Sequence, residues 1–495
     1  MTPVGFDNDK YLEEQSRAIL DRAAQFDNKL YLEFGGKLAQ DCHAARILPG
    51  FDPNVKLRLL QKLKEKIDIV ICIYAGDIER KKIRADFGIS YDADTLRIID
   101  MLRSLDISVR AVVVTRYAGQ PAVKAFINKL TRFGIRVYTH RAIPGYPTDL
   151  DMIVSDEGYG SNAYIETERP IVIVTGPGPS SGKMATCLSQ VYHEQKRGIR
   201  AGYAKFETFP VWNLPLKHPV NLAYEAATAD LADVNMIDPF HLEAYGATAV
   251  NYNRDVEVFP VLRAMLEQIL GECPYKSPTD MGVNMAGNCI FDNDAVSNAA
   301  KQEIIRRYYN ALCRMRKDGG AETEIEKIEL LMRKLSCSPT LDRPVVNAAL
   351  ARASETAAPA VAIELNDGRV VTGKTTSLLG ASSAALLNAL KALAGIDKEE
   401  DIISPEILAP IQVLKTENLG NHNPRLHTDE VLIALAISAA NSESADKAMK
   451  ALPALAHAEV HSTVILSEVD ASTFRKLGMQ LSCEPQYQTK KLFHR

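Results

Sequence analysis

A glycine-rich segment near the middle of the chain carries the clearest chemical signal in the sequence. Residues 176–183 read GPGPSSGK and lie between a β-branched run at 171–175 and a helical pattern at 184–197. This order of strand, glycine loop and helix is typical of a phosphate site, because backbone amides and the dipole at a helix start attract an anion. The candidate cofactor-binding residues of this segment are Gly176, Gly178, Ser180, Ser181, Gly182 and Lys183.

The match to the Walker A pattern of nucleotide-binding proteins is incomplete at two positions. Pro177 stands where the pattern has its first glycine, and Met184 replaces the hydroxyl residue that would bind Mg²⁺. A plain turn between strand and helix, with a solvated Lys183, is therefore the alternative. The literal match GRVVTGKT at 368–375 has a worse context, because its first glycine ends an Asn-Asp-Gly hairpin turn and the residues after it predict a return strand.

Strand and helix patterns alternate through the first part of the chain. Apolar runs predict buried strands at 29–34, 67–74, 109–115, 135–139, 151–154, 171–175 and 199–206. Helical patterns separate most of these runs, as in parallel βαβ units. We therefore expect an α/β fold: a doubly wound, mostly parallel three-layer sheet of the Rossmann or P-loop kind, a helical segment and a second, smaller α/β domain.

The residues that follow the predicted strands are mostly cationic, and ligands of such a sheet bind at the carboxyl ends of its strands. The candidate catalytic residues are Arg116, Lys183, Lys205 and Glu207. The candidate cofactor-binding set also includes Gly35, Gly36 and Lys37. Because the chain has a formal charge of −4, these cations indicate a small anionic substrate, although each of them alone is typical of a solvated loop.

Two aspartates are candidate ligands of Mg²⁺. Asp292 follows a short apolar run, Cys289-Ile290-Phe291, that resembles a Walker B strand, and Asp238 lies in a long polar and aromatic segment at 206–253. Three apolar residues before an aspartate are common in proteins, so this pattern is much less specific than the glycine loop.

Composition indicates a soluble globular protein of the cytoplasm. The chain has 495 residues, 46% of them hydrophobic and 24% charged, and its eight cysteines form no C-x-x-C pair. The sequence has no dense basic run, no signal-peptide pattern and no apolar run of bilayer length, so we expect no nucleic-acid partner and no membrane association. A homo-oligomer is the default expectation, because symmetric oligomers are common among soluble proteins.

The length of the chain predicts two or three domains. We expect an α/β nucleotide- or phosphate-binding domain at 1–335, with a helical insertion at about 255–335. A segment with three prolines and an alanine-rich run, at 336–359, is the expected linker. A smaller C-terminal α/β domain is expected at 360–495.

Four longer motifs resemble one family of bacterial proteins. They are LYLEFGGKL at 30–38, PGFDP at 49–53, GPGPSSGKMATCLSQVYHE at 176–194 and SPTDMGVNMAG at 277–287. The family that they resemble is a domain-of-unknown-function family with a larger N-terminal and a smaller C-terminal domain, and the resemblance covers essentially the whole chain. It implies a cytoplasmic bacterial protein of α/β architecture, and it supplies no catalytic residue.

Three functions are compatible with these residues. The first is a P-loop-like phosphotransferase or ligase that uses ATP or GTP with Mg²⁺, in which Lys183 and Arg116 neutralise the phosphates and an aspartate holds the metal. The second is a Rossmann-like enzyme that binds NAD(P) or a sugar phosphate without hydrolysing a nucleotide, with Glu207 at the place of the ribose-binding acid. The third is a non-catalytic regulatory protein that binds a nucleotide. The many polar loops favour an enzyme.

Overall fold

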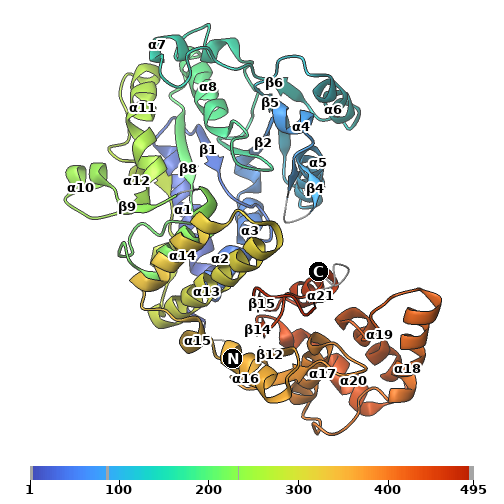
Figure 1. The fold of residues 1–495 in the computed structure, drawn as a ribbon. Helices are drawn as coiled ribbons and strands as arrows, with labels where there is room; N and C mark the ends of the chain where they lie inside the picture. Colours follow the sequence, from blue (N-terminus) through green and yellow to red (C-terminus); the bar gives the residue numbers. More distant parts are fainter. Residues whose placement is uncertain (1–3, 85–87, 232, 490–495) are drawn as a thin grey trace. The chain divides into compact units, whose positions relative to one another are not determined.

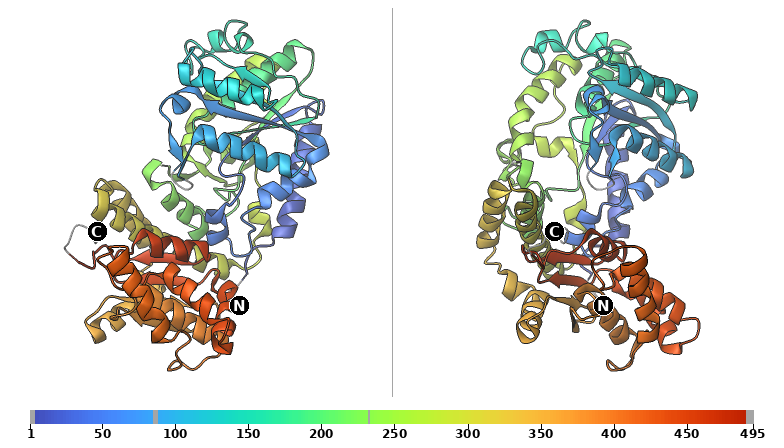
Figure 2. Two further views of the ribbon diagram at one scale, coloured as in Figure 1. Left: turned by 90° about the vertical axis from the view of Figure 1, so that its right-hand side faces the viewer. Right: turned by 45° about the vertical axis from the view of Figure 1, so that its right-hand side comes forward.

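The computed structural model describes residues 4–84, 88–231 and 233–489. The chain divides into two compact units, shown in Figures 1 and 2. The N-terminal unit consists of Gly5–Glu225 and Asp233–Ser297, and the C-terminal unit consists of Asn298–Arg495 with the short segments Met1–Val4 and Ala226–Ala232. None of the helices in the described ranges has the length and apolar character needed to cross a membrane.

Seven parallel strands form the central sheet of the N-terminal unit, in the order β11-β8-β1-β7-β2-β5-β6. In chain order they are β1 (Leu30–Phe34), β2 (Ile67–Tyr74), β5 (Val109–Thr115), β6 (Val137–Thr139), β7 (Ile171–Thr175), β8 (Gly202–Phe206) and β11 (Gly282–Val283). Two short antiparallel pairs accompany the sheet: β3 (Ile83–Arg84) with β4 (Ile89–Ser90), and β9 (Asn235–Ile237) with β10 (Val250–Tyr252). The predicted α/β class with a parallel sheet is confirmed.

Helices cover both faces of this sheet (Figure 2). The helices of this part of the chain are α1 (Asn8–Ala24), α2 (Cys42–Ile47), α3 (Val55–Lys62), α4 (Ala75–Glu79), α5 (Tyr91–Ser104), α6 (Pro121–Arg132), α7 (Leu150–Ile153), α8 (Lys183–Lys196), α9 (Pro219–Ala227), α10 (Pro239–Tyr245), α11 (Asn253–Leu270) and α12 (Pro278–Met281). The strand predicted at 151–154 is wrong, because α7 occupies this segment. Asp149 caps α7 by accepting a hydrogen bond from the amide of Met152, and this local bond favours a helical turn.

The middle of the sheet is fully buried because its strands are continuous runs of β-branched residues covered on both faces. All five residues of β7 are buried, and so are the first seven of β2. The crossover from β1 to β2 passes β7, and the crossover from β7 to β8 passes β1 in the opposite direction. The two chain paths therefore diverge at the carboxyl ends of β1 and β7, which is where ligands of doubly wound sheets bind.

A mixed sheet of four strands, in the order β13-β12-β14-β15, forms the centre of the C-terminal unit. Its strands are β12 (Ala360–Glu364), β13 (Val370–Lys374), β14 (Glu459–Ser462) and β15 (Gln480–Cys483). The hairpin of β12 and β13 confirms that GRVVTGKT is a return strand. A Cβ atom on Gly373 would lie 2.1 Å from the amide nitrogen of Ala385, so this glycine packs against a helix.

The remaining helices follow in the second part of the chain. They are α13 (Asn293–Asp318), α14 (Glu322–Lys334), α15 (Pro339–Asp342), α16 (Pro344–Thr356), α17 (Ala381–Ala394), α18 (Pro405–Val413), α19 (Thr428–Ser438), α20 (Glu443–Lys450) and α21 (Glu468–Lys476). The segment at 336–359, which was expected as a linker, contains α15 and α16. The predicted smaller α/β domain is confirmed in that helices pack against the four-stranded sheet.

Candidate functional site

The glycine loop joins the end of β7 to the start of α8, as predicted. Gly182 is the N-cap of α8 and has a left-handed backbone with φ of 87°, and Ser180 also has a positive φ of 56°. Within the described part of the chain, none of the backbone amides from 180 to 185 donates a hydrogen bond to a protein atom. The start of α8 therefore presents six free donors together with the positive end of the helix dipole.

At each of the three glycines of this loop, a larger side chain would clash with a neighbouring residue. A Cβ atom on Gly176 would lie 2.4 Å from the carbonyl oxygen of Cys72, and one on Gly178 would lie 2.5 Å from the hydroxyl of Tyr91. A Cβ on Gly182 would lie 2.8 Å from the side chain of Thr115, in addition to the backbone strain that its positive φ imposes. The loop is thus held tightly against the sheet edge, which fixes the direction of the free amides.

A cavity of about 520 Å³ lies at these amides. The loop and the start of α8 line it from one side with Ser180, Ser181, Gly182, Lys183, Met184, Ala185 and Thr186. The ends of β1, β5 and β6 and the segment after β6 line the rest with Glu33, Thr115, Arg116, His140, Arg141, Ala142, Ile143, Tyr146 and Asn162. The structure therefore places Arg116 beside the glycine loop. The sequence predicts both as parts of one ligand site.

Ser181 is the strongest sign that this cavity holds a ligand. Its side chain is buried, with 2% of the residue exposed, and its hydroxyl has no hydrogen-bond partner. Leaving a buried hydroxyl unpaired costs about 1–3 kcal/mol, so such groups normally have a partner. Because Ser181 lines the cavity beside the free amides, a ligand oxygen bound there would satisfy it.

Arg116 and Lys183 contact carbonyl oxygens of the loop and no carboxylate among the described residues. Arg116 donates to the carbonyl oxygen of Ser180 at 2.7 Å, and its guanidinium lies 3.5 Å from the centre of the Tyr74 ring. The Lys183 ammonium donates to the carbonyl oxygen of Gly178 at 3.5 Å, a long and weak bond. No carboxylate in the described ranges forms an ion pair with either cation, so both charges are available to an anion.

Glu33 and His140 are the lining side chains of the types that most often serve as general acids or bases. Glu33, near the end of β1, accepts a hydrogen bond from the hydroxyl of Tyr203 at 2.8 Å through Oε2. His140 is only 3% exposed, and this burial lowers its pKa to about 4, so its imidazole is neutral. Its Nε2 lies 3.2 Å from the carbonyl oxygen of Ala163 and donates to it, which leaves Nδ1 as the acceptor.

Lys205 and Glu207, predicted as catalytic residues, are not among the residues that line this cavity. The Lys205 ammonium pairs with Asp255 at 2.5 Å. Burial works to lower the pKa of Lys205, but the charges of Asp255, Glu207 and Glu33 outweigh it and raise the pKa above the ordinary value. Burial and the charge of Asp255 raise the pKa of Glu207 to about 8. The two residues thus form a buried charge cluster at the end of β8, and their catalytic roles stay predictions.

Gly35, Gly36 and Lys37 also lie outside the cavity lining. A Cβ on Gly36 would lie 3.3 Å from the Lys56 ammonium, which pairs with Asp41, and Gly36 has a positive φ of 69°. Gly35 has open space where its Cβ would be. A ligand role for this segment stays a prediction.

The two predicted metal ligands, Asp238 and Asp292, are helix caps outside the cavity lining. Asp238 is fully buried and its two oxygens accept from the amides of Phe240 and His241 and from Thr279. Asp292 accepts from the first amides of α13. The Walker B-like strand predicted at 289–291 is wrong, because Cys289 ends a short 3₁₀ helix and Ile290 makes only an isolated antiparallel bridge with Phe6. The described residues contain no cluster of three His, Cys, Asp or Glu side chains suited to a metal.

Sequence reasoning missed Glu33, Tyr146 and Asn162 as parts of the site. Glu33 is the one acid within the apolar strand LYLEF, and that position was a usable signal. Tyr146 and Asn162 follow β6 in a segment without a periodic pattern, so only the fold places them at the cavity.

Both parts of the chain match models of one protein family. The N-terminal model, described as Domain of unknown function DUF1846, N-terminal, matches residues 4–336, and the corresponding C-terminal model matches residues 341–493. A UPF0371 protein of Streptococcus thermophilus (strain CNRZ 1066) is 57% identical over 495 residues, which cover 100% of both chains. A UPF0371 protein of Streptococcus pyogenes serotype M5 (strain Manfredo) is 56% identical with the same coverage. The chain therefore belongs to the bacterial DUF1846 family, which its motifs had indicated.

Proposed function

We propose that this protein is an enzyme that binds a phosphorylated small molecule, with the phosphate at the start of α8. The observation that carries the proposal is the unpartnered, buried hydroxyl of Ser181 in a cavity where the amides from 180 to 185 have no partner among the described residues. A phosphate group has several oxygens that accept hydrogen bonds from such donors at once. The dipole of α8, a helix of 14 residues, also favours its charge.

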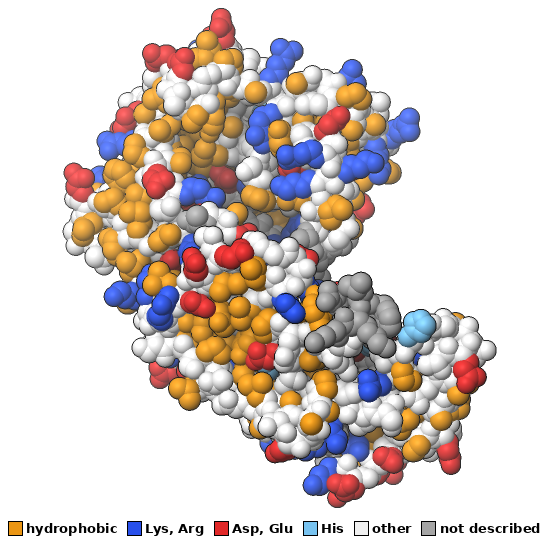
Figure 3. Space-filling view, viewed as in Figure 1, with side chains coloured by type: hydrophobic (Ala, Val, Ile, Leu, Met, Phe, Trp, Pro, Cys, Tyr) orange, Lys and Arg blue, Asp and Glu red, His pale blue; other side chains and the backbone are white. Residues whose placement is uncertain are grey.

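The cations around the loop support a phosphate rather than a neutral group. Lys183 and Arg116 contact only loop carbonyls and a tyrosine ring, and Arg141 lines the cavity with its side chain exposed. Figure 3 shows further Lys and Arg side chains gathered over the part of the N-terminal unit that holds α4, α5 and α6. Such a positive region raises the local concentration of an anionic ligand in a chain whose overall charge is negative.

The opposite wall suits the hydroxyl groups of a sugar or another polyol. Tyr203 donates to Oε2 of Glu33, and Oε1 has no partner among the described residues, so it can accept a hydrogen bond from a ligand hydroxyl. The hydroxyl of Tyr146 adds a polar group to the same cavity. Glu33 and the neutral His140 would move protons on the bound molecule, which makes proton transfer the chemistry that this site supports.

ATP or GTP with Mg²⁺ fits these residues less well than a sugar phosphate does. Met184 offers a thioether where Mg²⁺ would need a hydroxyl, and Glu33 is the one carboxylate among the described lining residues. NAD(P) also fits less well, because Glu207, the predicted ribose-binding acid, does not line the cavity. A sugar phosphate or a related polyol phosphate is therefore our first candidate ligand.

Calorimetric titration of the full chain tests this function. The panel contains sugar phosphates, the matching free sugars, NAD, NADP, and ATP and GTP with and without Mg²⁺. We expect a sugar phosphate to bind and its free sugar not to bind. Lys183→Ala should weaken binding by about 10- to 100-fold, because it removes a charged hydrogen-bond donor. Lys196→Ala, at the exposed far end of the same helix, should leave it unchanged.

Two results would change this assignment. Binding of ATP or GTP that needs Mg²⁺ and is lost in Lys183→Ala would establish a nucleotide-dependent transferase instead. If no phosphorylated compound binds, or if Lys183→Ala and Lys196→Ala weaken binding equally, the site at α8 is not a phosphate site.

A further inference from the structure

A second cavity, of about 1110 Å³, lies within the C-terminal unit. Strand β12 is antiparallel to both β13 and β14, and β14 is parallel to β15, so β13, β14 and β15 point the same way. Residues that follow their carboxyl ends line the cavity, including Thr375 after β13 and 464–467 after β14. The cavity therefore occupies the edge of the sheet where ligands of α/β domains bind.

Three helices begin at this cavity: α17, α19 and α21, with the N-caps Gly380, His427 and Ser467. The first amides of α17, those of 381–383, donate to no protein atom of the described chain. Ser382 lines the cavity with only 3% of its surface exposed, and its hydroxyl has no hydrogen-bond partner among the described residues. Unlike the Ser181 hydroxyl, the oxygen of Ser382 is not a fully buried atom, but it is an unpaired donor of a largely buried residue beside free amides, where a ligand oxygen could accept from it.

The charges that line the cavity favour an anion. Arg316, Lys317 and Arg425 form no ion pair with any carboxylate in the described ranges. Two of the acids that line the cavity already have partners, since Glu468 pairs with Arg475 and Asp470 is hydrogen-bonded to His427. Asp318 is the remaining acid, so three unpaired cations face one unpaired carboxylate. The net field at this sheet edge is positive.

His427 is held in a defined orientation at the cavity. Its Nδ1 lies 3.0 Å from Asp470, whose two oxygens also accept from Ser467 and from the amide and hydroxyl of Thr428. The carboxylate therefore keeps the proton on Nδ1, and Nε2 has no protein partner among the described residues. The hydrogen bond to Asp470 raises the pKa of His427 against the effect of burial. A positively charged imidazole would be a further donor to an anion.

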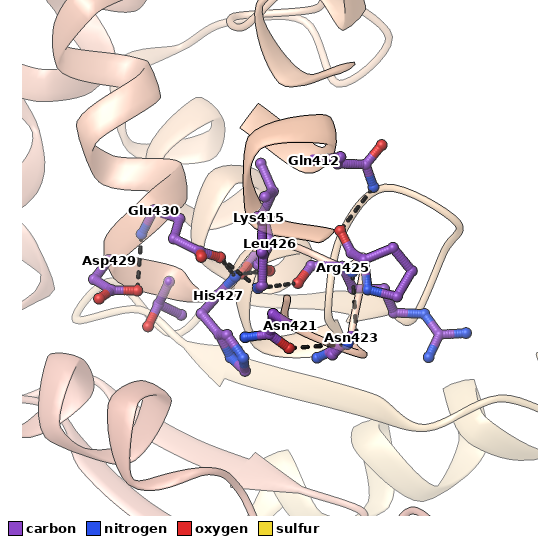
Figure 4. A network of polar contacts seen from close by, with 12 residues as sticks. Gln412, Lys415, Asn421, Asn423, Arg425, Leu426, His427, Asp429 and Glu430 are labelled. Carbon is purple, nitrogen blue, oxygen red and sulfur yellow. Dashed lines mark hydrogen bonds and ion pairs between the residues drawn. The ribbon is translucent and has the colours of Figure 1, made fainter. Parts of the chain in front are cut away.

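Hydrogen bonds and an ion pair within the loop hold the backbone around His427, as Figure 4 shows. The Lys415 ammonium donates to the carbonyl oxygen of Arg425 at 2.7 Å and pairs with Glu430 at 2.8 Å. Glu430 in turn accepts from the amide of His427 at 2.7 Å. In the same figure the imidazole of His427 points away from this network. The network thus fixes the backbone and leaves the ring for a ligand.

The same loop is tied directly to the start of α17. The carbonyl oxygen of Leu426 accepts from the amide of Gly380 at 3.3 Å and from the hydroxyl of Ser383 at 2.8 Å. Arg425 donates through Nε to the carbonyl oxygen of Thr376, in the segment that leads into α17. Free amides, the Ser382 hydroxyl, a guanidinium and an imidazole therefore gather around one end of the cavity.

We propose that this cavity is a second ligand site, separate from the glycine loop, and that it binds a phosphomonoester with an apolar or aromatic body. The phosphate lies at the amides of 381–383 and the hydroxyl of Ser382, with Arg425 and His427 Nε2 as charged partners. The organic body packs against the apolar lining of Leu426, Val464 and Ile465. Asp470 is a positioning residue that acts through His427.

Histidine NMR of the full chain tests this site. In protein labelled with ¹³C at histidine Cε1, the His427 resonance is identified by its loss in His427→Gln. Phenyl phosphate is the probe, and inorganic phosphate shows the contribution of the apolar body. We expect a saturable shift of the His427 resonance and a higher pKa of His427 in the complex. Phenyl phosphate should bind more tightly than inorganic phosphate, because its ring reaches the apolar lining.

Variants in the same unit separate the site from general charge effects. Arg425→Ala and Ser382→Ala should each weaken the phenyl phosphate response, the former by about 10-fold because it removes a charged donor. Arg369→Ala removes an exposed arginine that pairs with Asp367, and it should have no effect. Lys183→Ala should also have no effect, which distinguishes this site from the one at α8. The proposal is overturned if the His427 resonance does not respond, or if Arg425→Ala and Ser382→Ala both keep the wild-type affinity.

Discussion

The two units contain cavities that follow the same physical plan but differ in how their parts are distributed along the chain. In both, a helix begins at the carboxyl edge of a sheet, its first amides lack partners among the described residues, and a buried serine has an unbonded hydroxyl. At α8 the serine, lysine and amides come from one segment of ten residues, GPGPSSGKMA. At α17 the partners come from distant segments around Ser382, Arg425 and Asp470. A contiguous site leaves a motif in the sequence, and a dispersed one does not.

The glycine caps of the two helices should respond very differently to substitution. Gly182→Ala should lower the free energy of unfolding of the N-terminal unit by about 2–4 kcal/mol, because the residue has a positive φ and its Cβ would meet Thr115 at 2.8 Å. Gly380→Ala should cost about 1 kcal/mol or less, because φ is −66° and the nearest atom is 3.6 Å away. Thermal unfolding followed by calorimetry measures both. Equal losses would show that the α8 loop is not tightly packed.

The buried acids of the two units should give opposite pH dependence. Burial raises the pKa of Glu207 to about 8, so the folded protein keeps a proton that the unfolded chain loses near pH 4.5. Stability should therefore fall as the pH rises from about 4.5 to 8 through this group. Glu207→Gln should stabilise the protein at pH 8.5 more than at pH 5, as measured by urea unfolding. The idea fails if the stability gain of this variant is the same at both pH values.

Asp470 shows the opposite behaviour in the C-terminal unit. Although burial works to raise its pKa, the hydrogen bonds from His427, Thr428 and Ser467 lower it below the ordinary value. This contribution to stability is present above the pKa of an unfolded aspartate and is lost as the pH falls through the lower folded value. Asp470→Asn should also lower the pKa of His427, which histidine NMR measures directly. Asp446→Asn, an exposed control on α20, should leave that pKa unchanged.

Replacing Ser181 should affect stability and ligand binding in different ways. Ser181→Ala should leave stability unchanged or raise it slightly, by up to about 1 kcal/mol, because it removes an unsatisfied buried hydroxyl. The same variant should weaken phosphate binding at α8 by about 5- to 10-fold, since a ligand oxygen would lose a donor. Calorimetric unfolding and ligand titration on one sample measure both effects. A stability loss above about 1 kcal/mol would indicate that Ser181 has a structural role instead.

The histidines offer the smallest test, without any substitution. His140 should stay neutral from pH 8 down to about pH 5, because burial lowers its pKa to about 4. His427 should titrate above the ordinary histidine range, because Asp470 accepts its hydrogen bond. A pH titration of the ¹³C-labelled histidines separates the two. If His140 became charged near pH 6, its imidazole would not be buried as the structure shows.

Local sequence patterns predicted most helices and strands. They failed for features that depend on residues distant in the sequence but close in the fold. The β-branched run of β7, the glycine loop and α8 are contiguous, so periodicity located them correctly. The strand order, which puts β1 next to β7, comes from the tertiary fold, so Glu33 could not be assigned to the loop from the sequence alone. Likewise, the sequence places Lys205 at the end of a predicted strand, but only the fold shows that its ammonium pairs with Asp255.

The two Walker-like segments show that matching letters alone do not identify a phosphate-binding loop. GRVVTGKT fits the pattern by letters, yet the hairpin turn before it predicts the antiparallel strand that the structure contains. GPGPSSGK fits the pattern poorly, yet its position between a buried strand and a helix predicts the loop that is found. Context decides which segment presents consecutive free amides, because in β13 every second amide faces β12 in the antiparallel ladder.

The most direct test of phosphate binding at α8 is a titration of the full chain, labelled with ¹⁵N at glycine, with a sugar phosphate. Gly182 contributes a free amide at the start of α8, whereas the amide of Gly373 belongs to the hairpin of β12 and β13. Saturation of the site should move the Gly182 resonance and leave that of Gly373 in place. If Gly182 does not shift at saturating ligand, or if both glycines shift alike, the glycine loop is only a turn between strand and helix.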